Sequence, residues 1–381
     1  MRLVLIVLAA VTLVEQPRTG RRIYGPGVCG PIDPSYVSTA TETGGQPFPM
    51  SPAEIVNMSQ IMIETTRTDS VMLLWAGGTA ADQATFSIPV DSSISRITFS
   101  ATFDGTGGST VVASPEGVVM QQRAGSQDTV MSCGRILSVD APTAGAWRVT
   151  LKPSEHFWLV VHARSELDML STDFVRLGGR PGHEGLFPIE GQPIAGRPAT
   201  LRLQLSEGDV KAPEFTLLSR QGQSLGRVDL APIGDREFAG AIALPNVGFR
   251  VALTGVDGSG VPVQRVHARL FRAERIEVVS GGAVTARAGR EIALPFTVRN
   301  LGQRGRFRVT ALADGQLVTR IEPQMIDIGQ GAEGRVSVFL PAPQAADVGK
   351  EIEVRVVASL EDSTEMHYNS GVQLVTVVSP Q

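Results

Sequence analysis

The chain has few of the residues from which most catalytic and metal sites are built. It contains five histidines and two cysteines in 381 residues, and the histidines show no HxxxH or HxxE spacing. No HExxH motif, Walker loop or CxxC pair occurs. No nucleophile, base and orienting group form a recognisable set. The sequence therefore predicts a non-catalytic protein with no cofactor and no metal site.

Long runs of one charge and long apolar runs are also missing. The 34 basic and 38 acidic residues are scattered and give a net charge of −4. Binding to nucleic acid needs a concentrated basic surface, so we expect no nucleic-acid partner. After Val14, no stretch approaches the roughly 18 apolar residues of a membrane-spanning helix. We therefore expect no transmembrane segment.

The two cysteines, Cys29 and Cys133, are too few for a disulfide framework or a four-cysteine zinc site. One bridge between them is the alternative to two free thiols. Nothing in the spacing fixes such a pairing, and unpaired cysteines are the prediction.

The N-terminus has two main interpretations. Met1-Arg2 followed by the apolar stretch Leu3–Val14 has the size of a signal peptide, which favours secretion, although no A-x-A cleavage site follows. Alternatively, Leu3–Val7 is a buried strand of a truncated α/β domain. A wrongly placed gene start, leaving an unstable fragment, is a third alternative. Residues 1–22 are therefore predicted to be a signal-like or truncated strand segment.

One helix is predicted, over residues 52–66. Ser51 and Glu54 have the spacing of a capping box, and Pro52 occupies the first helical position. Apolar residues follow at helical spacing, namely Ile55, Met58, Met62 and Ile63. This helix belongs to a segment predicted over residues 23–70.

Beyond this helix the apolar residues alternate, and glycine and proline turns recur. The chain contains 41 glycines and 24 prolines, and regular short strands with such turns are typical of β-sandwiches. We predict a mainly β fold of tandem jelly-roll-like and immunoglobulin-like β-sandwiches. The predicted boundaries are 72–178 for the first sandwich, 182–273 for an immunoglobulin-like second, and 276–378 for an immunoglobulin-like or fibronectin-like third.

Two patterns could carry binding chemistry. Asp91-Ser92-Ser93-Ile94-Ser95 matches DxSxS, whose carboxylate and hydroxyls can ligate a divalent ion. That site needs a fully buried parallel strand, whereas Phe86–Val90 alternates and contains a proline. We predict a turn without a metal at Asp91. Trp147 heads an alternating strand after a glycine turn, so we predict a buried core residue, with a ligand-stacking aromatic as the alternative.

A family resemblance accompanies these patterns. Near the N-terminus, the sequence resembles the last strand and helix of a von Willebrand factor A domain, through Cys29-Gly30, Asp33-Pro34-Ser35-Tyr36, Ala40, Thr43-Gly44-Gly45-Gln46 and Phe48. Downstream it resembles the region that follows this domain in hemicentins, through Phe86–Asp91, Ala141–Trp147, Phe249-Arg250-Val251, Gly255-Val256-Asp257 and Gln264-Arg265-Val266. The resemblance covers roughly residues 23–272 and implies that 23–70 is a short α/β remnant of an A-type domain.

Hemicentins are extracellular, and their A-type domain precedes β-sandwich modules that build matrix and cell junctions. The resemblance implies a secreted or cell-surface adhesion scaffold whose partner is a protein or a matrix or cell-surface polymer. The metal-binding strand of an A domain is absent upstream of Thr43, so no metal ligand is carried over. The alternative function is an accessory carbohydrate-binding β-sandwich region of a secreted hydrolase.

Overall fold

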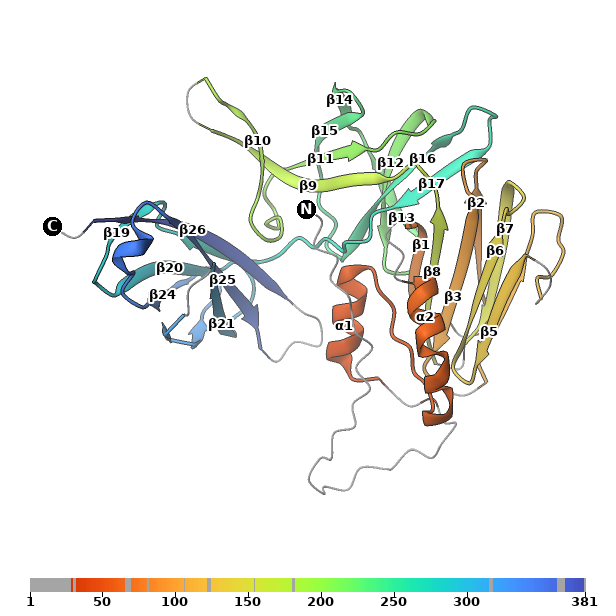
Figure 1. Cartoon of the computed structure of the whole chain (residues 1–381), viewed down its shortest axis with the longest axis horizontal. Helices are drawn as coiled ribbons and strands as arrows, with labels where there is room; N and C mark the ends of the chain where they lie inside the picture. The colour runs from red at the N-terminus through yellow and green to blue at the C-terminus, as the bar shows by residue number, and fades with distance from the viewer. Residues whose placement is uncertain are drawn as a thin grey trace. The chain divides into compact units, whose positions relative to one another are not determined.

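The computed structural model describes Cys29 and residues 32–65, 70–80, 82–105, 107–121, 125–153, 155–179, 182–314, 318–361 and 367–379. Strands dominate this part of the chain, which confirms the mainly β fold class (Figure 1). The predicted segment 1–22 lies outside the described residues. The chain divides into two compact units: unit 1 comprises the described residues up to Thr172 with Leu201–Ile242 and Val247–Phe271, and unit 2 comprises Asp173–Thr200, Ala243–Asn246 and the residues from Arg272 onward.

The first β-sandwich of unit 1 consists of a five-stranded and a three-stranded sheet. The larger sheet has the order β1 (Ser70–Thr79), β8 (His156–Arg164), β3 (Arg96–Phe103), β6 (Gly134–Asp140) and β5 (Ser126–Met131). The smaller sheet has the order β2 (Ala84–Val90), β7 (Gly145–Lys152) and β4 (Ser109–Ala113). Neighbouring strands in both sheets are antiparallel. Their inner faces share one apolar core, which includes Phe99 and Trp147.

A second β-sandwich completes the strands of unit 1. One sheet has the order β13 (Ser224–Val228), β12 (Lys211–Ser219), β16 (Phe249–Val256) and β17 (Pro262–Val266). In the other sheet, β11 (Ala199–Leu205), β15 (Glu237–Ile242) and β14 (Ala231–Gly234) are neighbours. The predicted alternation is visible in β11, where Leu201, Leu203 and Leu205 are buried. At β9 (Met169–Gly178) the chain passes into unit 2, where this strand pairs with β10 (Gly185–Pro188).

The five-stranded sheet of the first sandwich is covered on both faces. One face forms the core of the sandwich, and on the other Met72, Trp75 and Trp158 pack with Ala252 and Val266 of the second sandwich. This double covering explains why β1 is almost continuously buried instead of alternating. The two sandwiches are therefore joined through an apolar interface.

Helices at the N-terminal end partly differ from the prediction. The predicted helix is present as a 3-10 turn, η1 (Pro52–Asn57), continued by α2 (Met58–Thr65). A further helix, α1 (Pro34–Thr43), lies in the segment for which the resemblance implied a helix, but the expectation of a single helix at residues 52–66 is wrong. Its signal lies in the cap, because Asp33 accepts a hydrogen bond from the Ser35 amide at 2.9 Å and proline follows the cap. Its sequence contains few large apolar residues, so the spacing of apolar side chains gave no signal.

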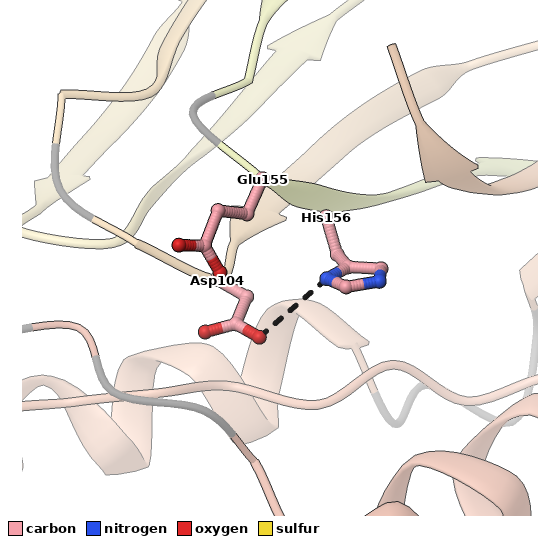
Figure 2. Close-up of side chains that lie close together, drawn as sticks. All are labelled: Asp104, Glu155 and His156. Atoms are coloured by element: carbon pink, nitrogen blue, oxygen red, sulfur yellow. Dashed lines mark ion pairs between the residues drawn. The ribbon is translucent and has the colours of Figure 1, made fainter.

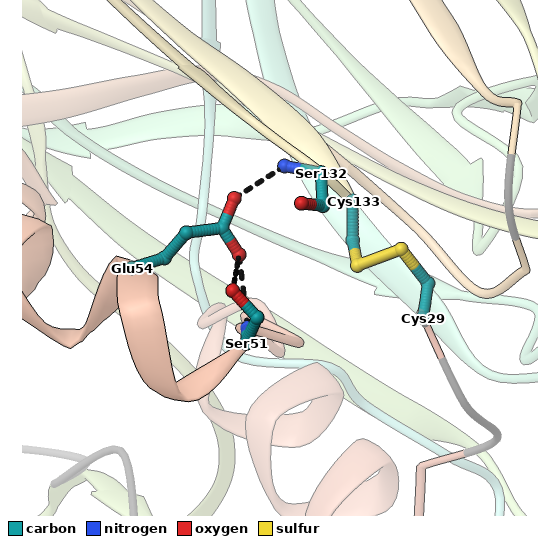
Figure 3. Close-up of a disulfide and its surroundings, with 5 residues drawn as sticks. All are labelled: Cys29, Ser51, Glu54, Ser132 and Cys133. Atoms are coloured by element: carbon teal, nitrogen blue, oxygen red, sulfur yellow. Dashed lines mark hydrogen bonds between the residues drawn. A yellow bond between two sulfur atoms is a disulfide. The ribbon is translucent and has the colours of Figure 1, made fainter. Parts of the chain in front are cut away.

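The prediction of unpaired cysteines is also wrong, because Cys29 and Cys133 form a disulfide, with Cα atoms 5.7 Å apart (Figure 3). The contact arises because the N-terminal segment packs against the turn between β5 and β6. Glu54 accepts hydrogen bonds from the Ser132 amide at 2.5 Å and from the Ser51 amide at 2.9 Å. A pairing across 104 residues depends on this packing and leaves no local mark in the sequence.

Unit 2 is built mainly from another β-sandwich. The four-stranded sheet has the order β18 (Ile276–Ser280), β20 (Ile292–Asn300), β24 (Glu333–Leu340) and β22 (Arg320–Glu322). The five-stranded sheet has the order β19 (Val284–Arg287), β26 (Tyr368–Val378), β25 (Glu351–Leu360), β21 (Gly305–Ala313) and β23 (Met325–Ile328). A short 3-10 turn, η2 (Ala345–Asp347), precedes β25. Phe296, Phe307 and Val354 belong to the buried core between the sheets. Within the described residues, no helix has the length and apolar composition needed to cross a membrane.

Candidate functional site

The DxSxS motif lies where the chain crosses from β2 to β3, and its carboxylate faces a buried arginine. Asp91 Oδ2 lies 2.7 Å from Arg265 Nη1, and both side chains are 1% exposed. The Ser93 hydroxyl donates to Asp91 Oδ1 at 2.5 Å. Arg265 also donates through Nη2 to Ser165 Oγ at 2.7 Å and through Nε to the Leu167 carbonyl at 2.8 Å. The motif therefore forms an ion pair between the two sandwiches of unit 1.

The electrostatics of Asp91 follow from this pairing. Burial acts to raise the pKa of Asp91, but the hydrogen bond and positive charge of Arg265, with help from Ser93, outweigh it and hold the pKa below its usual range. The ionised carboxylate is thus matched by the guanidinium. A metal ion at this position would have to displace Arg265.

A neighbouring carboxylate strengthens the same junction. Asp257 accepts hydrogen bonds from the amide and hydroxyl of Ser92, at 3.0 and 2.7 Å. The amides of Ser259 and Val261 donate to its other oxygen. Desolvation opposes ionisation, but these hydrogen bonds lower the pKa of Asp257 to about 2. Ser93 of the DxSxS motif and its neighbour Ser92 thus both bind carboxylates of the protein itself.

Arg250 joins the N-terminal segment to both sandwiches. Its guanidinium lies 4.1 Å from the centroid of the Trp75 ring, donates through Nε to the Ala268 carbonyl at 3.1 Å, and donates through Nη2 to the Thr41 carbonyl. The Thr41 carbonyl lies at the C-terminus of α1, where the helix dipole favours a cation. Burial lowers the pKa of Arg250 to about 9, so it stays charged at neutral pH.

A cluster of possible metal ligands lies at another edge of the first sandwich (Figure 2). Asp104 directly follows β3, and Glu155 directly precedes His156 at the start of β8. One ligand atom from each of the three side chains lies within 4.8 Å of the others. His156 Nδ1 is 3.7 Å from Asp104 Oδ2. This cluster was not predicted from the sequence, because its members come from distant strands and only the Glu155-His156 pair is adjacent in the chain.

Asp104 has the opposite electrostatic setting to Asp91. Burial raises the pKa of Asp104, the negative charge of Glu155 raises it further, and the smaller opposing effect of His156 does not compensate. The Asp104 side chain is 10% exposed and that of His156 is 54% exposed. A buried oxygen ligand therefore lies beside an accessible nitrogen ligand, an arrangement able to hold a cation.

A polar cleft of about 190 Å³ lies at a further edge of the first sandwich. Its lining includes Ser114, Glu116, Asp140, Thr143 and Trp147. The predicted burial of Trp147 is confirmed, since this residue is 2% exposed. Its indole donates to the Thr143 carbonyl at 2.9 Å, and its ring lies 5.6 Å from that of Phe99. Trp147 is thus a core residue that reaches the cleft only marginally.

One motif typical of hydrolases, GxSxG, is present at Gly222-Gln223-Ser224-Leu225-Gly226. In hydrolases this motif forms a strand-to-helix turn that exposes the serine as a nucleophile. Here it lies in the hairpin between β12 and β13, and Ser224 pairs with Leu218 across that hairpin. The structural context required for a nucleophile elbow is therefore not met.

The comparisons with known proteins point to the first sandwich. Residues 70–166 match the family described as the hemicentin galactose-binding domain-like module. This match coincides with the strands β1 to β8, so the resemblance to hemicentins is supported for this β-sandwich. The A-type part of the resemblance, over residues 23–70, stays a prediction.

Similarities to solved structures are weak. A Bacillus licheniformis lipase, BlEst2 in propeptide form, shares 13% identity over 56% of this chain, with a TM-score of 0.26, and the match spans 44% of the lipase chain. A DUF4785 family protein from Legionella pneumophila shares 9% identity over 80% of this chain and 92% of that one, with a TM-score of 0.36. Escherichia coli alpha-2-macroglobulin shares 11% identity over 82% of this chain and 33% of the macroglobulin chain, with a TM-score of 0.25. No curated protein matches this sequence.

Proposed function

We propose that the chain is a non-catalytic scaffold of a secreted or cell-surface protein, which binds a protein or a matrix or cell-surface polymer. The observation that carries this proposal is the match of residues 70–166 to the hemicentin galactose-binding-like module. The resemblance to hemicentins implies a role in adhesion.

The construction of unit 1 supports a scaffold. The Cys29–Cys133 disulfide, the Asp91–Arg265 ion pair and Arg250 tie the N-terminal segment and two sandwiches to one another. A rigid unit presents its loops in a fixed geometry, which lowers the entropy lost on binding. Disulfides persist in oxidising compartments such as the extracellular space, which supports the proposed localisation.

A second candidate function, an accessory carbohydrate-binding sandwich, is favoured by the polar cleft beside Trp147. Glu116, Asp140 and Thr143 would offer hydrogen-bonding groups to a hydroxyl-rich ligand. Because Trp147 is buried, such a ligand would be held by polar contacts with little stacking on the indole.

The test uses the purified full chain. It would be applied to an array of glycans and to immobilised matrix polymers, beside a panel of esterase, glycosidase, peptidase and phosphatase substrates. We expect saturable binding without turnover. Turnover that disappears when one polar residue is substituted would contradict the scaffold proposal.

Two variants separate the two candidate functions. Glu116→Ala alters the cleft, whereas Asp229→Ala alters an exposed carboxylate of the second sandwich, whose side chain is 98% exposed. Binding to a glycan that is weakened by Glu116→Ala and unaffected by Asp229→Ala would favour the carbohydrate-binding function. Binding to a polymer or protein that neither variant changes would favour a scaffold surface outside the cleft.

A further inference from the structure

We propose that Asp104, Glu155 and His156 form a binding site for a divalent transition-metal ion, with Zn²⁺ as the preferred ion. The site lies at the edge of the first sandwich where β3 ends and β8 begins (Figure 2). It does not depend on the identity of the scaffold's partner, and it can be tested separately.

The backbone holds two of the three ligands in place. Phe103 and Phe157 form the last pair in the register of β3 and β8. The Asp104 amide then donates to the His156 carbonyl at 3.0 Å, which continues the pairing by one step. The aspartate and the histidine are therefore brought together by the ends of two neighbouring strands of the central sheet. Ligands on rigid elements keep their geometry better than ligands on separate loops.

The spacing of the side chains suits a shared ion. The 3.7 Å between His156 Nδ1 and Asp104 Oδ2 exceeds the length of a hydrogen bond. Two ligands of a tetrahedral zinc ion, each bonded at about 2.0–2.1 Å, lie roughly 3.3 Å apart. Small side-chain rotations would therefore bring both atoms to bonding distance. Glu155 is exposed and can complete the set by rotating, since its ligand atom already lies within 4.8 Å of the other two.

The donor atoms select the class of ion. One imidazole nitrogen and two carboxylates suit Zn²⁺ and related transition metals, whereas Ca²⁺ and Mg²⁺ prefer sites made only of oxygen. Three protein ligands leave a coordination position open to water or to a ligand group of a partner. The exposed side of His156 provides a path for the ion.

A ring contact orients the histidine. The rings of His156 and Trp158 are stacked, with centroids 6.3 Å apart and planes inclined by 21°. Trp158 is 6% exposed and belongs to the interface with the second sandwich, so it is a fixed support. The histidine is thus held from one side while Nδ1 faces Asp104. A divalent cation would also offset the repulsion between the two neighbouring carboxylates.

The experiment is a calorimetric titration of the full chain, stripped of metal with a chelator, with ZnCl₂ as the probe. We expect one zinc ion to bind per chain and His156→Ala to weaken binding roughly tenfold or more. Zn²⁺ should also raise the unfolding temperature of the parent protein and not that of His156→Ala. Because the His156 side chain is half exposed, this variant should fold, and circular dichroism would verify it.

His367→Ala is the matched control. His367 Nδ1 lies 3.1 Å from Glu274 in unit 2, a histidine–carboxylate pair that belongs to no three-ligand group among the described residues. This variant should bind Zn²⁺ like the parent. No saturable binding in the parent, equal weakening by both variants, or a clear preference for Ca²⁺ over Zn²⁺ would each overturn the proposal.

Discussion

Asp91 and Asp104 are both buried carboxylates of the first sandwich, yet their surroundings are opposite. Asp91 pairs with Arg265 and has a lowered pKa, whereas Asp104 lies beside Glu155 and has a raised pKa. Asp91 carries the sequence motif of a metal site, and Asp104 carries none. The comparison teaches that the charge facing a carboxylate, which tertiary structure decides, determines whether it is available to a cation.

The largest expected effect comes from breaking the Asp91–Arg265 pair. Arg265→Ala should lower the free energy of unfolding by about 3–5 kcal/mol, because it leaves a buried carboxylate without its counter-charge. Urea denaturation followed by tryptophan fluorescence would measure the loss.

Two further variants sharpen this prediction. Arg227→Ala removes an exposed arginine from its pairs with Glu214 and Asp229, and should cost less than about 1 kcal/mol. The double variant Asp91→Leu with Arg265→Leu should be more stable than Arg265→Ala alone, since no buried charge is left unpaired. If Arg265→Ala were as mild as Arg227→Ala, the junction would not be held by this pair.

Removing the disulfide should have the next largest effect. Cys29→Ser with Cys133→Ser opens a loop with a sequence separation of 104 and should cost about 2–4 kcal/mol. The Cys133 carbonyl accepts a hydrogen bond from the Phe103 amide at 2.8 Å, next to Asp104. The loss should therefore be accompanied by weaker Zn²⁺ binding, measured by the same titration. Unchanged stability under both oxidising and reducing conditions would mean that the bridge contributes nothing.

The pH dependence of the free energy of unfolding distinguishes two buried groups, His162 and Asp91. Burial lowers the pKa of His162 on β8 from 6.5 to about 4, so the folded state keeps this ring neutral while the unfolded state protonates it. The contribution of neutral His162 to the free energy of unfolding is fully present above pH 6.5. It is lost as the pH falls toward 4, by at most about 1.4 kcal/mol per pH unit. Asp91, with a lowered pKa, contributes above its usual value of 3.8 and loses its contribution only below it.

His162→Gln tests this assignment. Urea denaturation of the parent at several pH values between 7 and 4 should show the decline, and the variant should show a flatter profile. An identical decline in both proteins would assign the acid sensitivity to other groups.

The features that the sequence predicted are those governed by local patterns. Alternating residues predicted strands such as β11, the Ser51–Glu54 capping box predicted a helical start, and the glycine turn before Trp147 predicted its burial. The features that were missed depend on distant contacts. Arg265 meets Asp91 and Cys29 meets Cys133 only after the two sandwiches and the N-terminal segment have packed. The metal-ligand cluster was missed for the same reason.

The smallest predicted effect is that of Asp104→Asn, which should differ in sign from that of the equivalent substitution Asp91→Asn. Asp91→Asn should destabilise the protein, because it removes the charge that matches the buried Arg265 guanidinium. Asp104→Asn should leave the free energy of unfolding unchanged or raise it by less than about 1 kcal/mol. The raised pKa of Asp104 means that the folded state disfavours its ionised form. A neutral amide of the same shape therefore removes both the cost of burying the charge and the repulsion by Glu155. The loss of attraction to His156 is the smaller effect. Urea denaturation of both variants, with a chelator present so that bound metal cannot add stability, would compare the signs directly. Destabilisation of more than about 1 kcal/mol by Asp104→Asn would show that the charge of Asp104 is stabilising even without a metal ion, and the contrast with Asp91 would fail.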